Sequence, residues 1–252
     1  MADITANSES DKKPVLIVLH QEASTAGRIG DILVQRGYAL DIRRPRFGDM
    51  LPETLVNHTG AIIFGGPMSA NDNEDFIRQE IDWISVPLRE NKPFLGICLG
   101  AQMLARNLGS TVRHHTQGLN EIGYYQITPT DMGSNFAQKV GAPWPSHVYH
   151  WHSEGFECPA GAEKLVSGEY FPNQAFRYGQ NAYAIQFHPE VTQDMMKLWT
   201  IKAAEKLTLP GAQDRNTQLE SRLRYDPEVD RWINRFIDFW LSSGNGDGLA
   251  LA

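Results

Sequence analysis

Apolar and polar positions alternate in two different ways along the first half of the chain. Short apolar runs predict strands over 15–20, 39–45, 60–66 and 93–98. Segments in which apolar residues recur at helical spacing separate or follow these runs, over 24–38, 75–91 and 101–109. Strands that alternate with helices in this order predict a parallel α/β sheet.

The second half of the chain is richer in strand-like segments. We predict strands over 121–128, 147–152, 163–168, 175–179 and 181–188, which would extend the sheet in antiparallel or mixed fashion. A polar loop is expected over 211–218, and an amphipathic helix over 226–243 carries an apolar stripe that indicates core packing. The predicted fold class is α/β, an open, mostly parallel or mixed twisted sheet flanked by helices, with an extended helical C-terminus.

Polar ends frame one predicted domain. Residues 1–13 and 244–252 have the composition of disordered tails. We expect a single domain over 14–243, in which 191–243 form a helical C-terminal extension.

Net charge and composition limit the kinds of partner and the cellular compartment that we expect. A net charge of -7 argues against nucleic acid and anionic membranes as partners, because an acidic surface attracts neither. No apolar run approaches the roughly 20 residues of a membrane helix, and the first residues lack a signal-peptide core. With only two cysteines, Cys98 and Cys158, a reducing cytoplasm is expected. We expect no cofactor and no metal, because the sequence has no P-loop and its histidines and cysteines lack ligand spacing.

Cys98 occupies the predicted corner between a strand and a helix. Gly96 and Gly100 flank it at two residues on each side, which matches the G-x-nucleophile-x-G elbow with cysteine in place of serine. The following helix N-terminus favours the thiolate, and the Leu99 N–H would face an oxyanion forming on an attacked carbonyl. The alternative is a buried structural cysteine, since free cysteines are among the most buried residues.

A nucleophilic cysteine needs a base, and His188 is the best candidate. It ends the predicted strand 181–188, and Glu190 follows closely enough to orient its imidazole. His152 also ends a strand near the expected pocket and is a weaker candidate for a supporting role. The strand over 60–66 ends in a glycine pair, so Gly66 would supply a second oxyanion donor beside Leu99.

At these residues the chain resembles the class I glutamine amidotransferase family. GGP at 65–67, GICLGAQ at 96–102 and QFHPE at 186–190 match the three signatures of that family in order and spacing. The resemblance covers roughly residues 14–190 and is greatest to stand-alone members related to the amidotransferase domain of GMP synthase. It implies a flavodoxin-like fold and a Cys98-His188-Glu190 triad. Cys98 would attack the side-chain amide of glutamine to form a γ-glutamyl thioester.

The same resemblance implies a substrate-binding set. Gln102 would contact the amino acid end of the substrate. The family's Ser/Asn-His-Gly-Asp/Phe stretch is matched to Ser153, Glu154, Gly155 and Phe156, so a glutamate stands where the family has histidine. A carboxylate near the α-amino group of the substrate would change what is recognised.

Three functions remain open at this point. The first is a glutaminase that passes ammonia to a separate synthetase or another acceptor. The second is a stand-alone hydrolase of γ-glutamyl peptides or amides that uses the same triad. The third is a non-catalytic binding or regulatory protein. The segment after Glu190 is expected to be core cover, with a lid or a homodimer face as alternatives.

Overall fold

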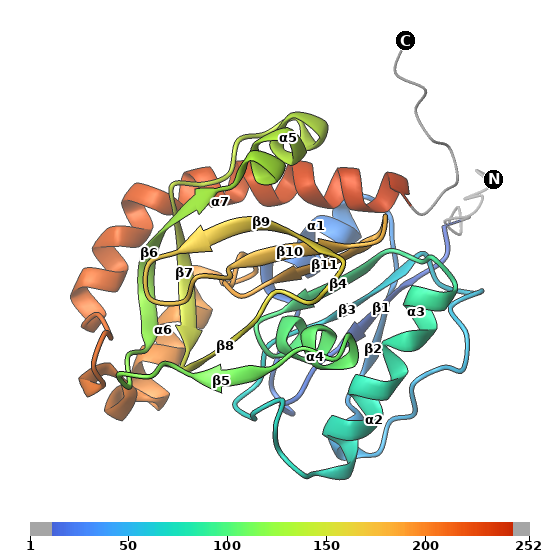
Figure 1. Cartoon of the computed structure of the whole chain (residues 1–252), viewed down its shortest axis with the longest axis horizontal. Helices are drawn as coiled ribbons and strands as arrows, with labels where there is room; N and C mark the ends of the chain where they lie inside the picture. The colour runs from blue at the N-terminus through green and yellow to red at the C-terminus, as the bar shows by residue number, and fades with distance from the viewer. Residues whose placement is uncertain (1–11, 244–252) are drawn as a thin grey trace, which may run out of the picture.

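A nine-stranded mixed sheet lies at the centre of the computed structural model, which describes residues 12–243 (Figure 1). The predicted tails over 1–13 and 244–252 therefore fall outside the described residues, apart from 12 and 13. The strand order is β2-β1-β3-β4-β11-β10-β9-β6-β7. The first five strands in this order are parallel to one another: β2 Leu40–Arg43, β1 Val15–Val18, β3 Gly60–Ile63, β4 Phe94–Ile97 and β11 Ala182–Ile185.

The remaining strands of the sheet are antiparallel. They are β10 Ala175–Tyr178, β9 Ala162–Gly168, β6 Glu121–Pro129 and β7 His147–His152. Two short strands, β5 Val112–His114 and β8 Glu154–Phe156, form a separate antiparallel ribbon that the sequence did not predict. The predicted fold class, a mixed α/β sheet flanked by helices and followed by a C-terminal helix, is confirmed.

Helices cover both faces of the sheet (Figure 1). One face packs on α1 Gly27–Gln35, α5 Asp131–Val140 and α7 Arg215–Ser243, and the other on α2 Asp75–Trp83, α3 Ser85–Arg89 and α4 Leu99–Asn107. Successive residues of a strand point to opposite faces, so Ile17 joins the first core while Leu16 and Val18 join the second. This two-sided burial explains the continuous apolar runs of the parallel strands.

Local capping residues explain two differences from the predicted helices. Helix α7 begins at Arg215 rather than near 226, because the Asp214 carboxylate accepts hydrogen bonds from the N–H groups of Asn216 and Thr217 and caps the first turn. The prediction of a polar loop over 211–218 was therefore wrong for its second half. Helix α5, which was not predicted, is capped in the same way by the Thr130 hydroxyl.

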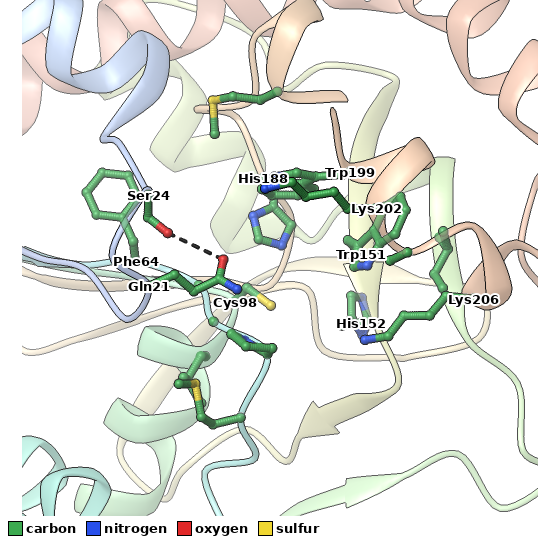
Figure 2. A pocket seen from close by; sticks show the side chains of 18 of the residues that line it. Gln21, Ser24, Phe64, Cys98, Trp151, His152, His188, Trp199, Lys202 and Lys206 are labelled. Atoms are coloured by element: carbon green, nitrogen blue, oxygen red, sulfur yellow. Dashed lines mark hydrogen bonds between the residues drawn. The ribbon is translucent and has the colours of Figure 1, made fainter. Parts of the chain in front are cut away.

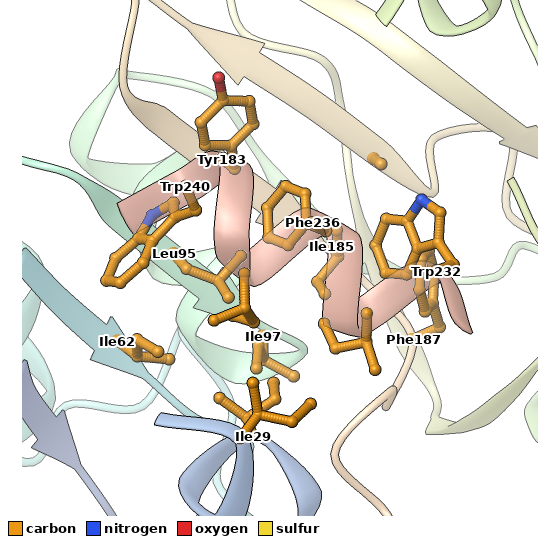
Figure 3. Packing of buried hydrophobic residues seen from close by; sticks show 14 of the residues in the cluster. Ile29, Ile62, Leu95, Ile97, Tyr183, Ile185, Phe187, Trp232, Phe236 and Trp240 are labelled. Carbon is orange, nitrogen blue, oxygen red and sulfur yellow. The ribbon is translucent and has the colours of Figure 1, made fainter. Parts of the chain in front are cut away.

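The C-terminal segment contains three helical elements. They are α6 Gln193–Lys202, the 3-10 turn η2 Ala204–Thr208 and α7; another 3-10 turn, η1, covers Pro45–Phe47. Trp232, Phe236 and Trp240 of α7 lie against the central strands (Figure 3), so the predicted apolar stripe is core packing. No helix within 12–243 is long and apolar enough to cross a membrane.

Removing a large side chain from α7 should destabilise the whole domain. Trp232 is 1% exposed and stacks on Trp144 with 4.9 Å between ring centroids. We expect Trp232→Ala to lower the free energy of unfolding by about 3–5 kcal/mol in urea titrations, through lost burial and the cavity left behind. Leu223→Ala on the same helix is the control, because Leu223 is 78% exposed and the change should cost less than about 0.5 kcal/mol. Equal losses from the two variants would contradict this packing.

Candidate active site

Cys98 forms the one-residue corner between β4 and α4. Its backbone has φ 50° and ψ -102°, a left-handed region that costs a non-glycine residue energy. Two backbone hydrogen bonds hold it there: the Cys98 N–H donates to the Ile185 carbonyl at 2.9 Å, and the Gln102 N–H donates to the Cys98 carbonyl at 3.0 Å. The sharp corner presents the sulfur at the carboxyl end of β4, at the N-terminus of a helix that favours negative charge.

The flanking glycines are required by close backbone contacts. A Cβ on Gly100 would overlap the carbonyl oxygen of Ile63 in β3, and a Cβ on Gly96 would overlap the carbonyl oxygen of Gly100. Helix α4 therefore packs directly onto the ends of β3 and β4, which only glycine permits at these two positions.

His188 lies just beyond β11, the strand next to β4. Its Nδ1 is 2.7 Å from Oε1 of Glu190, and its backbone N–H donates to the Tyr149 carbonyl of β7 at 2.7 Å. Figure 2 shows the imidazole and the Cys98 sulfur facing one another. All three predicted triad residues are buried. Neighbouring strand ends thus bring together residues that lie ninety positions apart in the chain.

The charges around His188 favour its protonated form. Burial alone lowers the pKa of this histidine, but the Glu190 carboxylate and the Cys98 sulfur outweigh burial and raise the pKa to about 10. Donation of the Nδ1 proton to Glu190 also fixes the ring so that Nε2 is free to exchange a proton with a reacting group.

A pocket of about 420 Å³ opens over these residues. Seven of the nine predicted site residues line it: Gly66, Cys98, Leu99, Gln102, Ser153, His188 and Glu190. Gly155 and Phe156 do not; Phe156 is buried in the core and packs edge-on against Phe176. Both residues lie in strand β8, which the sequence did not reveal: a Cβ on Gly155 would overlap the Phe171 ring, and Phe156 joins the hydrophobic core.

Segment 193–209 forms one wall of the pocket. Its lining residues combine apolar and basic side chains: Met195, Leu198, Trp199, Lys202, Ala203, Lys206 and Leu209. Trp199 stands edge-on to His188 with 5.2 Å between ring centroids. Figure 2 shows Lys206 near His152 and Lys202 near Trp199. Part of the segment after Glu190 therefore belongs to the site, which the prediction of core cover missed.

A buried cluster of Glu121, His150 and His152 lies behind the pocket wall, and only His152 reaches the pocket. The Glu121 Oε2 atom is 3.0 Å from His152 Nε2 and 3.3 Å from His150 Nδ1, and the two histidine nitrogens are 3.1 Å apart. Two histidines and a glutamate are a known ligand set for zinc. The expectation that the histidines lack ligand spacing was therefore wrong here. The H-x-H pattern in the predicted strand over 147–152 was the available signal, because residues i and i+2 share a face.

Hydrogen bonds can account for the short contacts in this cluster without a metal ion. The Glu121 carboxylate accepts from Gln174 Nε2 at 2.8 Å, and His152 Nδ1 donates to the Glu154 carbonyl at 2.9 Å. Burial raises the pKa of Glu121, but the two histidines outweigh it and bring the pKa down to about 2. Burial lowers the pKa of His150 to about 3 against the attraction of Glu121, so this ring is neutral. The ionised Glu121 thus holds His152 in place at the pocket wall.

Comparison with known proteins agrees with this geometry. The family model described as glutamine amidotransferase class I matches residues 18–202. The chain is 29% identical over 188 residues to YfeJ of Salmonella typhimurium, a glutamine amidotransferase-like protein, covering 73% of this chain and 78% of that one. A crystal structure of a glutamine amidotransferase from Methylobacillus flagellatus superposes with a TM-score of 0.85, at 25% identity, covering 92% of this chain and 95% of that chain.

Another relative is larger. The glutamine-hydrolysing GMP synthase of Porphyromonas gingivalis is 37% identical over 147 residues, which are 56% of this chain but 26% of the synthase. The similarity to that enzyme is therefore confined to about a quarter of its length.

The neutral, buried His150 predicts how stability changes with pH. Its pKa is about 3 in the folded protein against 6.5 for a free histidine, so between these values the unfolded chain binds a proton that the folded chain does not. Stability should therefore fall as the pH falls below 6.5, by up to about 1.4 kcal/mol per pH unit from this group. The contribution of Glu121 is lost only below pH 4.5, as the pH approaches about 2.

The measurement is urea unfolding between pH 6.5 and 4.5, the range in which His150 makes stability depend on pH and Glu121 does not. In His150→Gln the free energy of unfolding should change less steeply with pH, by the slope that corresponds to about one proton. Identical slopes for the wild type and this variant would show that His150 is not held neutral by burial.

Proposed function

Because the chain belongs to the class I glutamine amidotransferase family, we propose that its pocket hydrolyses the side-chain amide of glutamine and releases ammonia for a separate acceptor. The observation that carries the proposal is that Cys98 and the His188–Glu190 pair lie together in one pocket. A nucleophile, a base and a group that orients the base are what acyl transfer through a covalent intermediate requires.

The first half of the reaction forms a thioester. The Cys98 thiolate attacks the side-chain carbonyl carbon of glutamine, and the carbonyl oxygen becomes an oxyanion. We assign the backbone N–H groups of Gly66 and Leu99 to this oxyanion, because both residues line the pocket, Leu99 follows Cys98 in the chain, and Gly66 lies against the Leu99 side chain. Protonated His188 gives its Nε2 proton to the departing nitrogen, the C–N bond breaks, and ammonia leaves.

The second half restores the enzyme. Neutral His188 removes a proton from a water molecule, which attacks the γ-glutamyl thioester. The carbon–sulfur bond breaks, glutamate is released and the Cys98 thiolate and protonated His188 return. Through both halves Glu190 keeps the Nδ1 proton on the ring and so keeps Nε2 directed at the reacting atoms.

The family's substrate-binding stretch fits the pocket better when it is matched to residues 151–154 than to residues 153–156, where the sequence analysis placed it, because its histidine and acidic positions then fall on pocket residues. We propose that His152 takes the histidine position of the family pattern and Glu154 its acidic position. Both residues line the pocket, whereas Gly155 and Phe156 do not. In this register Glu154 is no departure from the family. Gln102 supports the same wall, because its Nε2 donates to the Glu154 carbonyl at 2.9 Å and to Gln186 Oε1 at 3.2 Å.

We propose that a separate synthetase uses the ammonia that this chain releases. The relative from Porphyromonas gingivalis is named a glutamine-hydrolysing GMP synthase, and the similar region makes up 26% of that enzyme. We therefore propose that this chain supplies the glutaminase half of such a reaction.

The basic wall favours a second candidate, the hydrolysis of γ-glutamyl peptides. Lys202 and Lys206 line the pocket, and among the described residues neither has a carboxylate within ion-pair distance. Two unpaired lysines suit a substrate that carries another negative charge beyond the scissile amide, such as the carboxylate of a γ-glutamyl amino acid. If this candidate is right, Lys206→Ala should raise KM for the peptide and leave KM for glutamine unchanged.

Loss of the nucleophile should abolish turnover. We expect Cys98→Ala to reduce glutamate release from glutamine and from γ-glutamyl peptides by at least about 10³-fold, because no other group forms the thioester. The measurement is glutamate release by the purified protein. Cys158→Ala is the matched control: Cys158 is partly buried outside the pocket, so this variant should keep the wild-type rate. A Cys98→Ala protein that still turns over either substrate would contradict the mechanism.

Loss of the orienting carboxylate should slow the reaction without removing the nucleophile. Glu190→Gln takes away the charge that raises the pKa of His188, so burial should bring that pKa down. We expect kcat to fall by roughly 10²-fold or more. The optimum should also shift to lower pH, because His188 must be protonated to release ammonia. An unchanged pH profile of kcat in this variant would mean that Glu190 does not control His188.

A further inference from the structure

A second buried histidine–carboxylate pair lies directly behind the glycine turn of the site. His20 follows β1 and Glu80 belongs to α2, and both are 0% exposed. The pair does not line the pocket, whereas Gly65 and Gly66 do. Parallel pairing of β1 with β3 explains the placement, because Val18 lies opposite Ile63 and the next residues of each strand continue side by side.

Each ring nitrogen of His20 faces one acceptor. Nδ1 is 3.1 Å from the carbonyl oxygen of Gly65, and Nε2 is 2.8 Å from Oε2 of Glu80. A carbonyl oxygen can only accept, so Nδ1 carries a proton and donates it to Gly65. Nε2 and Glu80 then share one further proton, which leaves the buried pair neutral overall. Among the described residues, Glu80 makes no other ion pair; its Oε2 contacts His20, and its buried Oε1 has no hydrogen-bond partner.

The turn that His20 contacts has little rigidity of its own. Gly65 and Gly66 both lack a Cβ, so the peptide plane between them is free to rotate. In a trans peptide the C=O and the N–H point in opposite directions. The Gly65 carbonyl points at His20, away from the pocket, and the Gly66 N–H therefore points the other way, toward the pocket side. A rotated plane would instead present a carbonyl oxygen to a developing oxyanion and repel it.

We infer that His20 and Glu80 are positioning residues that hold the Gly65–Gly66 peptide with the Gly66 N–H directed at the oxyanion. The inference rests on the proposed function, because it supplies the reason why that N–H faces the site. Glu80 fixes the ring of His20, and the ring fixes the carbonyl of Gly65. Neither side chain touches the substrate.

Two amide substitutions separate the two hydrogen bonds. The amide nitrogen of asparagine falls close to the Nδ1 position of histidine, so His20→Asn keeps the donor to Gly65 and loses Glu80. The longer His20→Gln places its amide near Nε2, so it keeps the contact with Glu80 and loses Gly65. We expect kcat to fall about 10²-fold in His20→Gln, as when one oxyanion donor is removed. KM should change little, and His20→Asn should stay within several-fold of the wild type.

Three measurements keep the outcome clear. Rates are expressed per active site, counted by alkylation of Cys98 with iodoacetamide, which needs no oxyanion donor and should proceed equally in both variants. Thermal unfolding reports whether a variant folds. If His20→Gln does not fold, Glu80→Leu takes its place: without a partner at Nε2 the ring of His20 is free to turn away from Gly65, and a kcat loss larger than that of His20→Asn is then expected. A pair that is only structural would lower the unfolding temperature in both variants and leave kcat per active site unchanged, and this result would overturn the inference.

A second acyl substrate distinguishes this inference from the proposed function. Hydrolysis of p-nitrophenyl acetate through Cys98 also forms an oxyanion but needs no recognition of glutamine. A wild-type protein that cleaves the ester but neither glutamine nor γ-glutamyl peptides would contradict the proposed function. The inference would still be supported if His20→Gln lowered ester hydrolysis more than His20→Asn, and overturned if the two variants cleaved the ester at the wild-type rate.

Discussion

The strained backbone of Cys98 is the constraint on which the rest of the site depends. A non-glycine residue at φ 50° is stable only where its surroundings hold it. Here the neighbouring strand β11 accepts the Cys98 N–H, the first turn of α4 donates to its carbonyl, and glycines on either side let α4 pack against β3. The corner therefore exists only when three adjacent parallel strands and one helix are assembled, which couples formation of the nucleophile to formation of the sheet.

The same parallel strands supply the other groups of the site. Strand β3 leads into Gly65 and Gly66, β11 leads into His188, and β1 leads into His20. Parallel strands end at one edge of a sheet, so four chemically distinct groups converge there without any of them being adjacent in the chain. The antiparallel half then closes the site. Strand β7 accepts the backbone N–H of His188 through Tyr149, and segment 193–209 forms the wall with Trp199.

Most of this arrangement could be predicted from the sequence, and the exceptions have physical causes. Buried parallel strands appear as continuous apolar runs. Cys98 and His188 could be identified as candidate site residues because each stands at the end of such a run. His20 has the same placement at the end of 15–20, but its partner Glu80 lies on a helix sixty residues away and carries no local signal. Strand β8 was missed because three residues are too short to show a period. The placement of Gly155 and Phe156 in the site failed with it. The start of α7 depends on one capping aspartate within a polar segment, which periodicity cannot detect.

The central claim is that Cys98 carries the γ-glutamyl group during turnover. Rapid acid quenching of the protein during reaction with a γ-glutamyl substrate, followed by intact-protein mass spectrometry and peptide mapping, tests this directly. We expect a mass increase of one γ-glutamyl group on the peptide that contains Cys98, present in the wild type and absent in Cys98→Ala. Turnover without an adduct on any peptide, or with the adduct on Cys158, would contradict it.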